Sequence, residues 1–284
     1  MKNLIQKVKL PQTDVFFERS SADGYALLGY AFAKSGLNYS PFIKDIESRN
    51  YTLNAAQKIN ATKTECTKDN IYIYTNWACA TFLNEIGADT SLFYRNAKDM
   101  GCYENGFHKY CLEEINYVVP NGTTAALFIY DLHKDTFVCK GLFKTLKKWQ
   151  IQGNWKYDIP TEQFPKGMKF EDNMHLGLIL YQLWQVRERY FDEEMIDKAL
   201  RLYIDPTRWI AKDRNDNPYF HGTIGWGVPV SFLIFHVYGD RIEKIIGTEK
   251  YESRYNYFKN ETITMLSHDN FRVRAYCAFA LSHI

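Results

Sequence analysis

The sequence predicts an all-α fold in which helical hairpins of similar length follow one another. The clearest helix lies within residues 169–190, KFEDNMHLGLILYQLWQVRERY, where Leu176, Ile179 and Leu180 recur at three- and four-residue steps. Polar side chains gather where this helix begins. The same layout, a polar entrance followed by an apolar helix, returns roughly every 45 to 55 residues, which is the length of a helical hairpin with its loops.

The chain opens with an irregular arm, residues 1–21, and three short helical patterns follow it. The stretch 23–36, DGYALLGYAFAKSG, predicts the first helix, because Asp23 can cap its start and Gly36 can end it. A second helix is predicted over 41–49, and a third pattern starts at Leu53. This part of the sequence shows no recognisable chemistry.

Five polar entrances follow, and each leads into an apolar inner helix. They are centred on Asn76, Asn121, Asn173, Tyr219 and Asn270. Outer helices with a charged face are predicted between them, over residues 90–100, 138–150, 191–204 and 250–267.

The inner helices are apolar nearly all round, so neighbouring hairpins must cover them. An open stack of hairpins and a closed ring would both achieve this. A ring is favoured, because the polar entrances lie at the same end of every inner helix and closure would bring them together. With five clear inner helices, the ring is predicted to be closed or incomplete.

Length and composition favour one folded domain over residues 1–284, with the arm at its edge. The chain is 46% hydrophobic and 24% charged, and its formal net charge is +2. This near balance gives no reason to expect a nucleic acid or an anionic membrane as the main partner. Aromatic residues make up 16% of the chain, with 21 Tyr, 19 Phe and 6 Trp, which suits a wet cleft where rings pack on sugar faces.

The N-terminus does not read as a secretory signal peptide, because lysines interrupt its apolar residues. No run reaches the roughly 18 apolar residues of a membrane-spanning helix. We therefore expect a soluble, cytoplasmic protein with no membrane insertion. The six cysteines show no CxxC spacing, so free thiols are expected rather than a zinc knuckle or a redox pair.

Two stretches resemble α/α-toroid proteins. The stretch 146–158, LKKWQIQGNWKYD, resembles a turn of the terpenoid cyclase and prenyltransferase type. The stretch 171–183, EDNMHLGLILYQL, is similar to the Asp-x-x-His entrance of toroid proteins that act on sugars: six-hairpin glycosidases, polysaccharide lyases and sugar epimerases. The resemblance covers roughly residues 69–284. It implies an α/α toroid and, from the second stretch, a carbohydrate-active enzyme.

Several motifs of these families are absent from the sequence, and their absence decides which substrate class is favoured. The Asp-rich cyclisation motif of squalene cyclases is absent, since residues 213–217 do not reproduce it. No Asp, Cys and His zinc set of the protein prenyltransferases is found. His221 and Gly222 also lack the flanking Cys of lanthipeptide cyclases. A terpenoid or prenyl substrate therefore ranks second to a polysaccharide or glycan precursor.

Two kinds of sugar chemistry fit the entrance residues. Glycoside hydrolysis needs two carboxylates about 5 to 10 Å apart, and Asp172 with Asp213 or Asp216 could supply them. A uronate lyase or C5-epimerase needs a base, an acid and a donor that neutralises the substrate carboxylate. His175, His221 and Tyr219 suit the base and acid roles, so this second chemistry is slightly favoured. Lyase, epimerase and hydrolase outcomes stay open.

The remaining candidates are expected to bind substrate. Asn173 or Arg272 could neutralise a substrate carboxylate, and Trp226 or Trp155 could form a sugar platform. Further candidates at the other entrances are Tyr74, Asn76, Tyr117, Asn121 and Asp269.

No metal or cofactor is expected, because a set of His175, His221 and Asp172 has no short-range ligand spacing. Each candidate also has a purely structural interpretation. Asp, Asn and His at a helix start can be caps and packing groups. Five other histidines are expected to be structural: His108, His133, His236, His268 and His283. The competing class is therefore a non-catalytic helical-repeat protein that binds a glycan or another protein.

Overall fold

The computed structural model describes residues 1–10, 22–48, 66–99, 119–151, 173–205, 210–212, 218–220 and 227–284. In this part of the chain the fold is of the all-α class, as predicted. The one described strand pair is short: β1 (Ile210–Lys212) runs antiparallel to β2 (Pro218–Phe220), with Ala211 opposite Tyr219. A polar loop was expected over this stretch. No described helix is long and apolar enough to cross a membrane.

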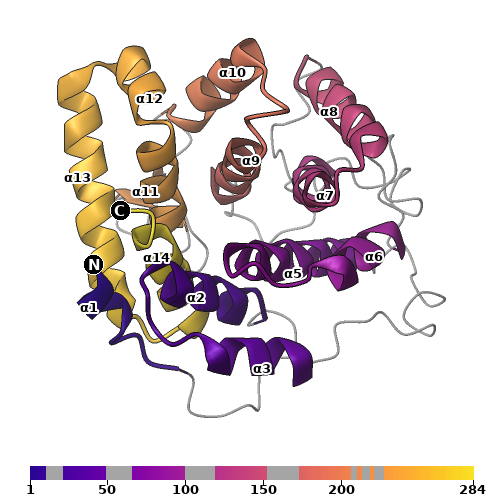
Figure 1. Cartoon of the computed structure of the whole chain (residues 1–284). Coiled ribbons are helices and arrows are strands. Elements are labelled where there is room, and N and C mark those ends of the chain that lie inside the picture. The colour runs from indigo at the N-terminus through magenta and orange to yellow at the C-terminus, as the bar shows by residue number, and fades with distance from the viewer. Residues whose placement is uncertain are drawn as a thin grey trace.

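Six helices contact one another in a series that returns to its starting point. Each contacts the next, and the last, α14, contacts the first, α2. They surround the centre of the molecule in Figure 1. In contact order they are α2 (Ala22–Lys34), α5 (Cys66–Glu85), α7 (Val119–Leu132), α9 (Asn173–Gln185), α11 (Gly227–Val237) and α14 (Phe271–Leu281).

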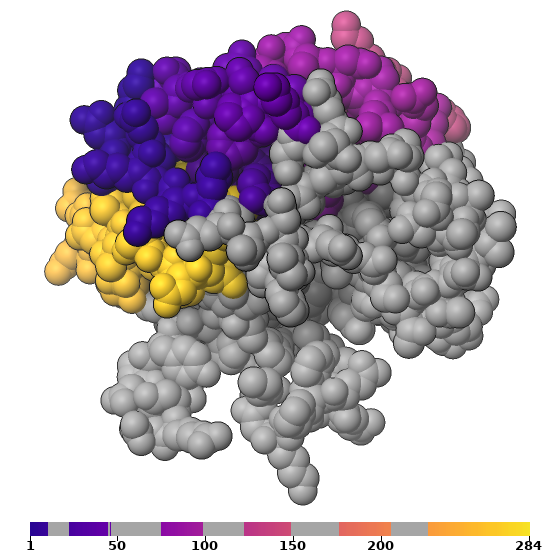
Figure 2. All heavy atoms as spheres, turned by 90° about the horizontal axis from the view of Figure 1, so that it is seen from below, coloured from indigo at the N-terminus to yellow at the C-terminus, as the bar shows by residue number. Residues whose placement is uncertain are grey.

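The sixth member of this ring of contacts, α2, was predicted as a helix but was not assigned to the ring. Figure 2 shows the indigo N-terminal helices against the yellow C-terminal ones, in keeping with the contact between α2 and α14. Five inner helices were recognised from sequence because their polar entrances are alike. The contacts of α2 with α5 and α14 place it beside these five, a position that the sequence did not predict.

Other helices lie outside these six in Figure 1. Along the chain, α3 contacts α2, α6 contacts α5 and α7, α8 contacts α7, α10 contacts α9, and α13 contacts α11 and α14. Their bounds are α1 (Lys2–Ile5), α3 (Ser40–Ser48), α6 (Ser91–Asp99), α8 (Thr136–Ile151), α10 (Glu193–Tyr203), α12 (Gly239–Ile246), α13 (Thr248–Thr264) and the 3₁₀ turn η4 (Met265–Ser267).

Inner and outer helices differ in how much of their surface is apolar. In α11, GVPVSFLIFHV, every residue from Val228 to Phe235 is buried. The outer helix α10 buries one face and begins with Asp192, whose side chain accepts a hydrogen bond from the amide of Met195 at 2.8 Å. Acidic residues in its first turn and Arg201 in its last suit the helix dipole. The outer helix α10 is thus amphipathic, as the sequence predicted.

The inner helices point the same way, because contacts join like ends. Asp23 in the first turn of α2 pairs with Arg272 in the first turn of α14. Gly177, early in α9, lies against Val230, early in α11. Contacts also join the second halves of helices: Gly29 with Phe82, Trp77 with Gln185, Asp131 with Arg189 just beyond α9, and His236 with the carbonyl of His283.

The connections into and out of the inner helices differ in length. Residues 35–39 lead from α2 to α3, 86–90 from α5 to α6, and 133–135 from α7 to α8. The connections that lead into α7 and α9 are much longer, residues 100–118 and 152–172. Long segments therefore lead into α7 and α9, whereas short ones leave α2, α5 and α7; α14 is entered by the short connection of residues 268–270.

The helix α5 begins earlier than expected. It starts at Cys66, so Tyr74 and Asn76 lie inside it rather than at its entrance. The sequence between Cys66 and Trp77 contains neither Gly nor Pro, so nothing there stops a helix. Tyr72 and Tyr74 alternate in sequence as strand residues do, yet both lie within this helix.

The start of the chain is held to the domain rather than free. Residues 2–5 form α1, and Ile5 is buried. The guanidinium of Arg274 donates to the carbonyl of Lys9 from Nε at 3.1 Å and from Nη2 at 2.8 Å. The rest of the predicted arm, 11–21, and the helical pattern from Leu53 lie outside the described residues.

Candidate functional site

The predicted site residues belong to the segments that enter the inner helices. Asp172, His221, Trp155, Trp226 and Tyr117 lie outside the described residues. For five other candidates the structure describes the backbone: Asn173 and His175 in the first turn of α9, Asn121 in the first turn of α7, Tyr219 in β2, and Tyr74 in α5. The assignments of these residues stay predictions.

Asn76 is a described candidate with a contact of its own. It is 3% exposed, and its side-chain oxygen accepts a hydrogen bond from Nδ2 of Asn96 on α6 at 3.2 Å. This contact joins an inner helix to an outer one. It gives Asn76 a structural role, and its role in substrate binding stays a prediction.

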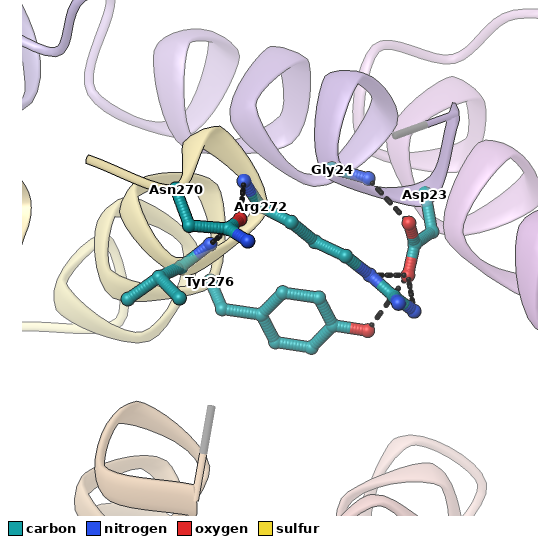
Figure 3. A network of polar contacts seen from close by, with 6 residues as sticks. Asp23, Gly24, Asn270, Arg272 and Tyr276 are labelled. Atoms are coloured by element: carbon teal, nitrogen blue, oxygen red, sulfur yellow. Dashed lines mark hydrogen bonds and ion pairs between the residues drawn. The ribbon is translucent and has the colours of Figure 1, made fainter. Parts of the chain in front are cut away.

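Arg272, the proposed partner of a substrate carboxylate, already faces a carboxylate of the protein. Figure 3 shows its side chain reaching from α14 to Asp23 on α2. Nε of Arg272 donates to Oδ2 of Asp23 at 2.8 Å, and Nη2 donates to the same oxygen. The hydroxyl of Tyr276 donates to Oδ2 at 3.0 Å, and the amide of Gly24 donates to Oδ1 at 2.9 Å. We call Asp23, Arg272 and Tyr276 the Asp23 cluster.

Burial and charge set the state of this cluster. Asp23 is 2% exposed, so its carboxylate is almost removed from water. Burial alone would lower the pKa of Arg272, but Asp23 and Tyr276 outweigh it and hold that pKa above its ordinary value. Burial, helped by the neighbouring carboxylate of Asp23, raises the pKa of Tyr276 well above its usual range. Arg272 thus stays charged beside Asp23.

The entrance of α14 is the one predicted entrance whose cap is described. The side chain of Asn270 accepts from the amides of Arg272 at 2.9 Å and Val273 at 3.4 Å, so Asn270 is the N-cap. Asp269, a predicted substrate-binding residue, is exposed, and its carbonyl accepts from Nη1 of Arg274 at 2.8 Å. This entrance therefore shows the structural use that a polar helix start can have.

Aromatic side chains from three inner helices meet in the centre of the ring. Trp77 of α5, Tyr181 of α9 and Phe279 of α14 contact one another edge to face, with ring centroids 5.4 to 6.3 Å apart. Each is at most 1% exposed. The indole of Trp77 also donates to Oε1 of Gln185 at 2.8 Å. These rings fill the interior towards the C-terminal ends of the inner helices.

Tyr181 continues this cluster to the end of α14. Its hydroxyl donates to Nε2 of His283 at 2.8 Å, and Nδ1 of His283 donates to the carbonyl of Phe279 at 2.9 Å. Burial, and after it the nearby positive charge of Lys34, lowers the pKa of His283 to about 3, so the imidazole is neutral. Tyr30 stacks on the same imidazole, with centroids 5.6 Å apart.

Three other histidines expected to be structural also contact protein groups. Nε2 of His133 lies 3.0 Å from the hydroxyl of Thr90, and Nε2 of His236 donates to the carbonyl of His283 at 3.0 Å. Nδ1 of His268 accepts from the amide of Asn270 at 3.0 Å. His108 lies outside the described residues.

One buried amide is not fully satisfied. Gln182 on α9 is fully buried, and its Oε1 accepts from the hydroxyl of Thr124 on α7. Its Nε2 has no hydrogen-bond partner among the residues that the structure describes. In the part of the chain that the structure describes, no group of three or more His, Cys, Asp or Glu residues could hold a metal ion.

The Asp23 cluster was not recognised from sequence. Asp23 was interpreted only as a helix cap, and Arg272 only as a ligand for substrate. The two residues are 249 positions apart, and no local pattern links residues at that separation.

Comparison with known proteins adds no relative. No family model, no curated protein and no solved structure matches the chain. The class of the molecule therefore rests on its own contacts: an all-α protein whose inner helices meet in a ring and point the same way.

Proposed function

We propose that the chain is an α/α toroid and that it binds and processes a carbohydrate at the N-terminal end of its inner helices. The observation that carries the proposal is the series of contacts that returns from α14 to α2. With like ends together, the first turns of the inner helices share one end. All predicted site residues except Tyr74 and Asn76 belong to those first turns or to the sequence that leads into an inner helix.

The N-terminal end of such a ring suits an acidic sugar. The start of a helix carries a partial positive charge and backbone amides that have no partner within the helix. In α14 the side chain of Asn270 already accepts from the amides of Arg272 and Val273, so at that start mainly the partial charge is available. Several parallel helices add these charges at the same end, where a uronate carboxylate would be favoured. Arg272 adds less than its formal charge suggests, because Asp23 neutralises it.

The proposed roles follow the chemistry of an acidic sugar. His175 and His221 act as base and acid on the carbon beside the carboxylate, with Tyr219 as a further proton donor. Asp172 serves as a carboxylate for hydrolysis if the reaction cleaves with water. Asn173 and the aromatic candidates Trp155 and Trp226 hold the sugar.

The terpenoid alternative is disfavoured by the ring centre. Cyclisation of a long apolar substrate needs a large apolar cavity among the inner helices. Trp77, Tyr181 and Phe279 are in contact there and almost unexposed, so they do not line a water-sized space. The described interior thus leaves no room at that level.

The test is a panel of acidic and neutral polysaccharides with wild type and the variants His175→Ala and His221→Ala. Absorbance in the ultraviolet reports unsaturated lyase products, reducing ends report hydrolysis, and proton exchange with deuterated water reports epimerisation. We expect activity on an acidic polysaccharide that both variants lose. The matched control is His133→Ala, because His133 lies at the opposite end of α7.

Two outcomes would reject the proposal. Activity that survives in both variants would remove the site from these entrances. Tight glycan binding without turnover, unaffected by either variant, would make the protein a binding module and the histidines packing residues.

A further inference from the structure

The outer helix α8 has an exposed face of one charge. Its sequence, TFVCKGLFKTLKKWQI, contains Lys140, Lys144, Lys147 and Lys148 and no Asp or Glu. Every other described outer helix of eight or more residues contains at least one acid. The net charge of +2 hides this local excess, because acids elsewhere on the chain balance it.

Three of these lysines share their face with a bare aromatic ring. At 100° per residue, Phe137, Lys140, Lys144 and Lys148 fall within an arc of about 80°, which forms one stripe along the helix. All four are exposed, and Phe137 is 72% exposed, more than any other large hydrophobic residue in the described chain. The stripe spans about 16 Å along the helix axis, with successive lysines about 6 Å apart.

Two described acids beside α8 are already engaged. Asp192 pairs with Lys147, on the flank of the stripe. Asp135, at the start of α8, accepts from the hydroxyl of Tyr94 at 2.8 Å and the amide of Val138 at 3.4 Å. No described acid pairs with Lys140, Lys144 or Lys148. Their charges are open to an external anion.

We propose that this stripe of α8 is a surface binding site for a linear acidic glycan, separate from the candidate site at the N-terminal ends of the inner helices. The lysines bind carboxylates or sulfates that recur along the chain, and Phe137 packs on the apolar face of one sugar ring. The choice of a glycan rests on the proposed function. The choice of a linear polyanion rests on the lysine stripe itself.

The shape of the stripe favours a glycan over a membrane. Helices that lie on a bilayer insert a continuous apolar face. In α8 that face is used inside the protein, where Cys139, Leu142 and Leu146 are buried towards α7. One phenylalanine is too little apolar surface for anchoring, whereas a single ring suffices to hold one sugar.

The test compares binding by wild type, by the triple variant Lys140→Gln/Lys144→Gln/Lys148→Gln and by Phe137→Ala. The probes are polygalacturonate, alginate and heparin, with dextran as the neutral polysaccharide. We expect the triple variant to bind acidic glycans about tenfold more weakly at low salt, from three exposed charge pairs. Binding by wild type should weaken as salt rises, and Phe137→Ala should weaken binding without changing the salt dependence.

The charge-matched control is Lys44→Gln/Lys244→Gln/Lys250→Gln, which removes three exposed lysines from α3, α12 and α13. An equal loss in this control would show that only net charge matters and would overturn the proposal. Binding to none of the acidic glycans, or a preference for phosphatidylserine vesicles or poly-glutamate, would also overturn it.

The experiments distinguish a failure of the α8 site from a failure of the proposed function. Turnover of a glycan by wild type, with unchanged binding by the triple variant, rejects the α8 site alone. Weaker glycan binding by the triple variant, with no turnover by wild type, supports the α8 site and rejects the enzyme.

Discussion

Replacing Asp23 with alanine should destabilise the protein more than any surface substitution. The variant leaves the guanidinium of Arg272 and the hydroxyl of Tyr276 without their shared acceptor. Arg272 has a side chain only 19% exposed, so water cannot fully replace the lost carboxylate. The two helices joined by this contact, α2 and α14, are the first and last of the ring.

The size of the effect follows from the burial of the pair. Removing one partner of a buried ion pair costs about 3 to 5 kcal/mol, because the other charge is left unpaired. For a domain of this size we expect the melting temperature to fall by about 6 to 10 °C. Urea unfolding followed by circular dichroism at 222 nm, at pH 7, measures the free energy change directly.

A double-mutant cycle separates the pair from general packing. Arg272→Met removes the cation that Asp23 neutralises, so Asp23→Ala/Arg272→Met should be less destabilised than the sum of the two single variants. The control is Asp269→Ala, an exposed carboxylate near the same cluster, which should change stability by less than about 0.5 kcal/mol. Additive single effects, or an Asp23→Ala variant as stable as wild type, would refute the assignment of the ring contact to this ion pair.

Two further predictions concern packing and pH. Gly177→Ala should cost about 1 to 3 kcal/mol in urea unfolding, because a Cβ there would lie 2.4 Å from Cγ1 of Val230; an unchanged midpoint would show that α9 and α11 can separate freely. In the folded protein the pKa of His283 is lowered from 6.5 to about 3. As the pH falls, the unfolded chain therefore binds a proton at His283 before the folded protein does. The contribution of His283 to stability is thus complete above pH 6.5 and is lost as the pH falls towards 3. The loss is at most about 1.4 kcal/mol per pH unit, and His283→Gln should show a shallower fall between pH 6.5 and 4 than wild type.

The helical class was predictable because it depends on local patterns. The stretch from Asn173 carries its own cap candidates and three- and four-residue apolar spacing, and α9 begins there as predicted. The start of α5 was predicted wrongly, because the helix begins at Cys66 and the sequence between Cys66 and Trp77 contains neither Gly nor Pro to stop it. A helix boundary is hard to predict where no such residue marks it.

The polar contacts were less predictable, because they join distant parts of the chain. Asn270 was foreseen as a cap, since capping involves only the next three residues. The pairing of Asp23 with Arg272 depends on the ring bringing the first and last inner helices together. The buried indole of Trp77 likewise finds Gln185 across the ring, 108 positions along the chain.

The Asp23 cluster changes how a substrate carboxylate would be recognised under the proposed function. Arg272 was the predicted cationic partner, but its guanidinium lies against Asp23, and displacing that buried ion pair would cost several kcal/mol. A substrate carboxylate at this end must then be stabilised chiefly by the amides at the starts of the inner helices and by neutral donors such as Asn173. Backbone amides bind a carboxylate without needing a charged side chain, so the acidic sugar and the ring closure do not compete for the same arginine.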